Sequence, residues 1–186
     1  MTGAGGTRRT RVVLAHGASG TAEQMQPHVD GLIARGFDAH AIDLPTRKAE
    51  SAIPVYRDVL ASLPPSGQGS RVAIGGQSYG GRVATLLAAD DPAGIDALVL
   101  FSYPLHAPGR AASWEGRAVH LPRITLPTLF LSGEADPLAR IDLLREAAGR
   151  MPKATLRTWS GQGHWLGSVL DEALDATAEW LRAMFR

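Results

Sequence analysis

The sequence contains no cysteine among its 186 residues. This absence excludes disulfide bonds, a thiolate nucleophile and a zinc site built from cysteine ligands. A chain without cysteine fits a reducing compartment, so we expect a cytoplasmic protein.

The sequence also lacks an excess of charge of one sign, since its net formal charge is +1 with 20% charged residues. This balance gives no argument for a nucleic-acid partner. No apolar run approaches the roughly 20 residues that span a bilayer, so we expect no membrane partner. The first ten residues, MTGAGGTRRT, lack the apolar core of a signal peptide. We predict a flexible N-terminal tail over residues 1–10 and a single domain over residues 11–186.

Short apolar runs alternate with amphipathic stretches along the rest of the chain. The alternation predicts an α/β fold with a mostly parallel sheet of about six strands and helices on both faces. The segment 104–123 is rich in Pro and Gly and lacks periodicity, so we expect a long loop there. The expected strands are 11–17, 37–45, 71–76, 95–104, 127–133 and 153–159, and the expected helices are 21–36, 51–65, 79–90, 138–151 and 168–185.

Ser78 lies in the stretch GGQSYGG, between an expected strand and an expected helix. The pattern Gly-x-Ser-x-Gly in this context is typical of a nucleophile elbow, a sharp turn that exposes a reactive serine. We expect a strained serine backbone, and glycine at 76 and 80 because side chains there would collide across the turn. The alternative is a glycine-rich loop that opens a helix or binds phosphate.

A serine hydroxyl is a poor nucleophile without a base. His164 is the candidate for this base. It follows the last expected strand in the stretch WSGQGHW, where flanking glycines let the loop reach the sheet edge. The alternative is a loop histidine that only orders its turn. Of the other histidines, His28 is expected on the surface of a helix, and His40 within a strand.

Asp136 is the candidate acid that orients the base. It lies in SGEADPL after the expected strand 127–133, and the order Ser78, Asp136, His164 is that of hydrolases with this sheet. Glu134 shares the turn and is the second choice. The alternative role for Asp136 is the N-cap of a helix that begins near Leu138.

Two backbone N–H groups are expected to stabilise an oxyanion. One belongs to Tyr79, directly after the serine, and the other to Ala18 in the loop HGASG, with Ser19 as the next choice. Placement after strands also suggests substrate-binding residues, namely His16, Ser19, Tyr103 and His106.

The stretches AHGASG, GGQSYGG, SGEADPL and GQGHW, in this order, resemble the α/β-hydrolase superfamily. With FSYPLHAPGR, the chain looks similar to small hydrolases akin to dienelactone hydrolase and to the testis-expressed hydrolase-like proteins. The resemblance implies a serine hydrolase with Ser78, Asp136 and His164 as its triad, and no metal or organic cofactor. The first two antiparallel strands of the superfamily and a large lid insertion are missing. A minimal core is therefore expected, with an open site that is available for a second copy or a partner protein to cover.

The expected activity is hydrolysis of an ester or related acyl bond in a small substrate. Two alternatives stay open: a hydrolase-like binding or scaffold protein without turnover, and an acyltransferase or cofactor-free haloperoxidase that uses the same triad.

Overall fold

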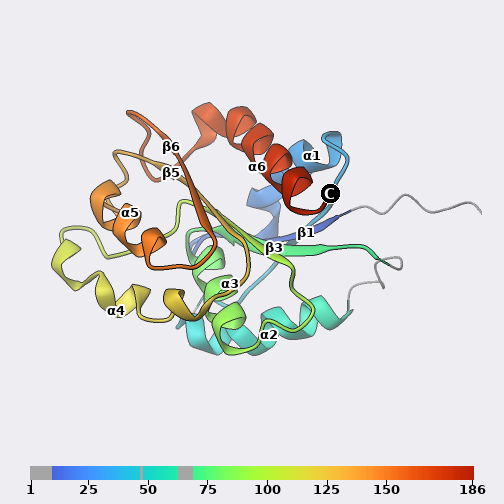
Figure 1. The fold of residues 1–186 in the computed structure, drawn as a ribbon, viewed down its shortest axis with the longest axis horizontal. Coiled ribbons are helices and arrows are strands. Elements are labelled where there is room, and N and C mark those ends of the chain that lie inside the picture. Colours follow the sequence, from blue (N-terminus) through green and yellow to red (C-terminus); the bar gives the residue numbers. More distant parts are fainter. Residues whose placement is uncertain (1–9, 47, 63–68) are drawn as a thin grey trace, which may run out of the picture.

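A six-stranded sheet forms the centre of the computed structural model, which describes residues 10–46, 48–62 and 69–186 (Figure 1). Every pairing between neighbouring strands is parallel, which confirms the predicted sheet. The predicted flexible tail, apart from its last residue, lies outside the described residues. In the order β2-β1-β3-β4-β5-β6, the strands are β2 (Asp38–Ile42), β1 (Arg11–Ala15), β3 (Val72–Gln77), β4 (Ala97–Phe101), β5 (Thr128–Gly133) and β6 (Ala154–Trp159).

Helices cover both faces of this sheet (Figure 1). One apolar cluster joins the sheet to α2 (Ala49–Ser62), α3 (Tyr79–Asp90) and α5 (Ile141–Gly149). A second cluster on the other face joins it to α1 (Gln26–Ala34) and α6 (Leu170–Met184). Strands β1, β4 and β5 are buried along their whole length, as expected for parallel strands that are covered on both faces.

The segment 104–123 is not a long loop, so that prediction was wrong. It contains the short helices η2 (Ala111–Ser113), α4 (Glu115–Ala118) and η3 (Leu121–Arg123). Trp114, Ala118 and Leu121 are buried in the apolar cluster of α2, α3 and α5. Three separate short turns bury these side chains, so their spacing has no single helical period.

The prediction of a helix over 21–36 is confirmed in its main part, although its first turn is the 3-10 helix η1 (Ala22–Met25) and α1 follows. Pro27 lies in the first turn of α1, where a missing N–H costs little. His28 was expected on the surface, but only 4% of it is exposed. Its ring packs edge-on against Phe101 with the ring centroids 4.8 Å apart.

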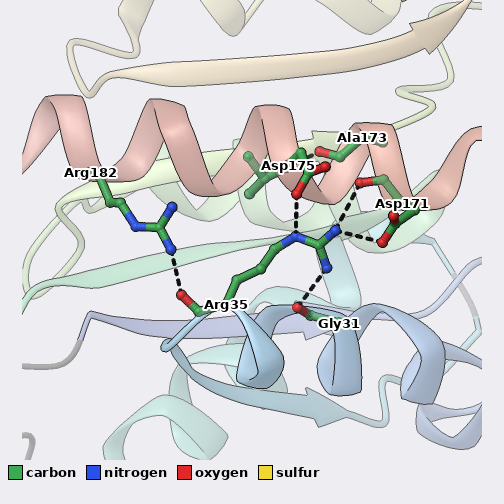
Figure 2. A network of polar contacts seen from close by, with 7 residues as sticks. Gly31, Arg35, Asp171, Ala173, Asp175 and Arg182 are labelled. Carbon is green, nitrogen blue, oxygen red and sulfur yellow. Dashed lines mark hydrogen bonds and ion pairs between the residues drawn. The ribbon is translucent and has the colours of Figure 1, made fainter.

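A polar network joins α1 to α6 (Figure 2). The guanidinium group of Arg35 donates hydrogen bonds to Asp171 and Asp175 of α6 and to the carbonyl oxygen of Gly31. Arg182 of α6 donates in return to the carbonyl oxygen of Arg35. The network therefore connects the end of α1 to both ends of α6. In the parts of the chain that the structure describes, no helix is long and apolar enough to cross a membrane.

Candidate active site

Ser78 occupies a sharp turn between β3 and α3, with a backbone φ of 49° and ψ of −108°. A positive φ is uncommon outside glycine and stores strain of about 1–3 kcal/mol. Two backbone hydrogen bonds hold the turn: the Ser78 N–H donates to the carbonyl oxygen of Phe101 at 2.8 Å, and the Gly80 N–H to that of His16 at 3.0 Å. The strained turn that the sequence predicts is therefore present.

The glycines at 76 and 80 leave room for strand β1. A Cβ atom at Gly76 would lie 2.1 Å from the carbonyl oxygen of Ala15, and one at Gly80 would lie 2.3 Å from the same atom. The predicted collision thus involves the neighbouring strand and not the other side of the turn. Gly76 also has a φ of +145°, which side chains rarely permit.

His164 lies between Ser78 and Asp136. Its Nε2 atom is 2.9 Å from Ser78 Oγ, and its Nδ1 atom is 2.7 Å from Asp136 Oδ2. The carboxylate can only accept, so Nδ1 carries the proton and Nε2 is the acceptor that faces the serine hydroxyl. The other carboxylate oxygen accepts the N–H of Leu138 at 2.8 Å. Asp136 is 3% exposed, while a quarter of the His164 side chain reaches solvent.

The turn that carries Asp136 packs directly on the loop that carries His164. The Ala135 N–H donates to the carbonyl oxygen of Gln162 at 2.8 Å, and the Glu134 N–H to that of Trp159 at 3.0 Å. A Cβ atom at Gly133 would lie 2.2 Å from the carbonyl oxygen of Gln162. Because β5 ends in glycine, the two loops can approach closely.

Glu134, the second choice for the acid, points elsewhere. Its carboxylate accepts hydrogen bonds from Thr158 at 2.9 Å and from Arg145 at 3.2 Å. Asp136 is not the N-cap of a helix near Leu138 either, because α5 begins at Ile141 with Arg140 as its N-cap.

A cavity of about 390 Å³ opens beside Ser78. This volume lies near the lower end of the range for small-molecule sites, about 300–1,000 Å³. Both predicted oxyanion-hole residues, Ala18 and Tyr79, line it next to the serine. The complete lining is Ala18, Lys48, Ala49, Ser78, Tyr79, Arg82, Pro104, Ala107, Pro108, Arg117 and Leu138.

The four predicted substrate-binding residues are not among those that line this cavity. His16 is buried, and its Nε2 atom accepts the N–H of Leu44 at 3.1 Å. Ser19 is exposed in the turn after β1. The chain bends there so that Ala18, and not Ser19, lines the cavity.

Tyr103 and His106 hold the backbone behind the cavity. Tyr103 is 1% exposed, with its hydroxyl 3.4 Å from the carbonyl oxygen of Arg117. His106 is 3% exposed, and its Nε2 atom accepts the N–H of Arg140 at 3.0 Å. Both residues follow a strand, as the sequence predicts, but both side chains point into the protein.

Lys48, Arg82 and Arg117 are cavity residues that the sequence analysis missed. They come from three segments that are distant in sequence, so no local pattern joins them. Of the three, only Arg82 could be placed near the serine from the sequence, since it follows Ser78 by about one helical turn on α3.

Two buried histidines near the site are held neutral. Burial lowers the pKa of His28 to about 4. The pKa of His120 is also lowered to about 4, chiefly by burial and then by the positive charge of Arg82. In the described structure, Nδ1 of His28 has no hydrogen-bond partner, whereas Nε2 of His120 forms a hydrogen bond with Thr85 Oγ1 at 2.9 Å.

Comparison with known proteins gives a family match and several similar folds. The family described as the alpha/beta hydrolase domain matches residues 8–180. The monoacylglycerol lipase of Paleococcus ferrophilus has a TM-score of 0.81 at 18% sequence identity, over 95% of each chain. A predicted CIB-like hydrolase of Thermoplasma acidophilum has a TM-score of 0.75 at 20% identity, over 95% of this chain and 88% of that one.

A third similar structure is Est1E of Butyrivibrio proteoclasticus with ferulic acid bound. It has a TM-score of 0.79 at 15% identity, over 97% of this chain and 91% of that one. At these identities the solved structures establish a common fold.

Proposed function

Because the chain belongs to the alpha/beta hydrolase family, we propose that it is a serine hydrolase that cleaves an ester or related acyl bond of a small substrate. One observation carries the proposal: Ser78 Oγ, the His164 imidazole and the Asp136 carboxylate form a continuous hydrogen-bonded row, and the Ser78 end of this row lines a cavity. The similar fold of a lipase and of Est1E supports the same class of reaction.

In the first half of the reaction, Ser78 Oγ attacks the carbonyl carbon of the ester while Nε2 of His164 takes the hydroxyl proton. The carbonyl oxygen becomes an oxyanion, which the N–H groups of Tyr79 and Ala18 stabilise. Asp136 stabilises the imidazolium that forms. His164 then gives its proton to the leaving oxygen, the ester C–O bond breaks, and the acyl group stays on Ser78.

In the second half, a water molecule attacks the acyl carbon while His164 takes one of its protons. The bond between the acyl carbon and Ser78 Oγ breaks, and His164 returns the proton to the serine. The products are an alcohol and a carboxylic acid, so each turnover consumes one water. His164 must be unprotonated to accept the proton of Ser78.

The test is hydrolysis of short-chain p-nitrophenyl esters by the wild type, by Ser78→Ala and by Ser160→Ala. Ser160 is an exposed serine after β6 and serves as the matched control. We expect wild-type rates from Ser160→Ala and only the background rate from Ser78→Ala. Undiminished turnover in Ser78→Ala would rule out this nucleophile, and a folded wild type without turnover would favour a non-catalytic binding protein.

A further inference from the structure

The cavity beside Ser78 carries an unbalanced positive charge. Lys48, Arg82 and Arg117 all line it, and its lining contains no carboxylate. The remaining lining, apart from the serine, is mainly apolar, with Pro104, Pro108 and Leu138 among its members. A substrate in this cavity therefore meets a largely apolar surface with several cationic groups.

Only one of the three cations has an acidic partner in the described part of the chain. Arg82 lies 3.5 Å from Glu50, and it also donates to the carbonyl oxygen of Arg117 at 3.1 Å. The Arg117 guanidinium makes one long contact, 3.5 Å, with the carbonyl oxygen of Pro104. For Lys48 and Arg117, the described residues provide no ion pair.

The polar groups beneath the cavity do not neutralise this charge. Tyr103 lies close to both Arg82 and Arg117, but burial raises the pKa of its phenol, which stays uncharged. His120 is neutral at pH 7 and contributes no charge of either sign. Asp43, at the same sheet edge, is bound by the N–H of Ala22 at 2.7 Å and does not line the cavity.

Half-buried arginine that lacks an acidic partner is costly unless a ligand supplies one. The Arg117 side chain is partly buried and leaves most of its N–H donors without a partner among the described residues. A planar guanidinium of this kind binds a carboxylate or a phosphate through paired hydrogen bonds. The exposed Lys48 adds a second positive charge.

We propose that the substrate of the Ser78 site is an ester with a second, anionic group, a carboxylate or a phosphate, which Arg117 and Lys48 bind in this cavity. The inference rests on the proposed hydrolase function and narrows its substrate class. Arg82 holds the backbone of Arg117 in place and adds to the positive potential.

Matched pairs of esters test the proposal. Mono-p-nitrophenyl glutarate is compared with p-nitrophenyl valerate, which has the same length without the carboxylate. 4-Acetoxyphenyl phosphate is compared with phenyl acetate and places the anion in the alcohol part. Each pair gives a ratio of kcat/KM, anionic over neutral, for the wild type, Arg117→Gln and Arg157→Gln. Intrinsic differences in ester reactivity cancel when the ratios of two proteins are compared.

Arg157 is the matched control because it lies exposed in the middle of the edge strand β6. It does not line the cavity, and the described residues give it no ion pair. We expect Arg117→Gln to lower the anionic-over-neutral ratio about ten- to hundredfold in one pair, as for loss of a hydrogen bond to a charged group. Arg157→Gln should keep the wild-type ratio. The pair that responds shows which kind of ester the site prefers, one with a carboxylate in the acyl part or one with a phosphate in the alcohol part.

A ratio that Arg117→Gln leaves unchanged in both pairs overturns the proposal, even when both esters are hydrolysed and the hydrolase function stands. A binding measurement covers the case of no turnover. Calorimetry on Ser78→Ala should show tighter binding of at least one anionic ester than of its neutral match, and equal affinities in both pairs would contradict the proposal without any reference to catalysis.

Discussion

The buried carboxylate of Asp136 lies 2.7 Å from Nδ1 of His164, the ring nitrogen opposite the one that faces Ser78. Asp136→Asn would remove the negative charge, and because the amide oxygen would accept the N–H of Leu138, the amide NH2 would face Nδ1 and favour the wrong imidazole tautomer. We expect kcat to fall by about 10³–10⁴-fold. Glu134→Gln is the matched control in the same turn, and it should stay within a few-fold of wild type because Glu134 bonds to Thr158 and Arg145. Normal activity in Asp136→Asn with a loss in Glu134→Gln would reverse the assignment.

Gly133→Ala tests the packing of the two loops that carry the acid and the base. Its new Cβ atom would approach the carbonyl oxygens of Gln162 and Gly163 to 2.2 and 2.3 Å. The loop must shift, and a displacement of about 1 Å at a catalytic group costs about a hundredfold in rate. We therefore expect a loss of at least this size in ester hydrolysis.

The control for Gly133→Ala is Gly149→Ala at the end of α5, where an added Cβ atom meets nothing within 4 Å. Activity should be unchanged there, and stability equal or slightly higher, since alanine favours the helix. Equal activity in both variants would show that the close approach at Gly133 does not position His164.

The stability of the fold should depend on pH through the buried His28. Its pKa is about 4 in the folded protein and 6.5 in the unfolded chain. The unfolded chain therefore binds the proton more readily, and the stability present above pH 6.5 is lost as the pH falls from 6.5 toward 4. This single group should remove about 2 kcal/mol of the free energy of unfolding between pH 7 and pH 5.

Urea unfolding of wild type and His28→Leu at both pH values measures this contribution. The variant should lose less stability than the wild type on going to pH 5. The same pH dependence in both proteins would mean that the imidazole of His28 is hydrated in the folded state.

Arg35→Met should loosen the contact between α1 and α6. The variant keeps much of the aliphatic stem but loses the hydrogen bonds to Asp171, Asp175 and Gly31 (Figure 2). Because both aspartates are largely exposed, the expected loss is modest, about 1–2 kcal/mol in the free energy of unfolding. In wild type the contribution should shrink at high salt. An unfolding midpoint that does not move would show that apolar packing alone joins the two helices.

The sequence predicts those parts of the fold that repeat a period or fix a turn. The six strands are apolar runs between helical stretches, and the elbow at Ser78 follows from glycines at fixed offsets. The sequence does not predict residues whose role depends on neighbours that are distant along the chain. Glycine is needed at 133 because the carbonyl oxygen of Gln162 packs against it. Arg117 lines the cavity beside Ser78 because the chain folds back to the serine in a segment without periodicity. The rings that pack on the buried His28, those of Phe101 and Trp165, are distant from it in sequence.

The most direct test of Ser78 as the nucleophile is to map the residue with which a fluorophosphonate probe reacts. Intact mass and peptide mapping should show one adduct per chain, on the peptide that contains Ser78. The adduct should be absent from Ser78→Ala and strongly reduced in His164→Ala, because the probe needs the hydroxyl and the base that accepts its proton. Labelling that persists in Ser78→Ala, or none in the folded wild type, would contradict the assignment of Ser78 as the nucleophile.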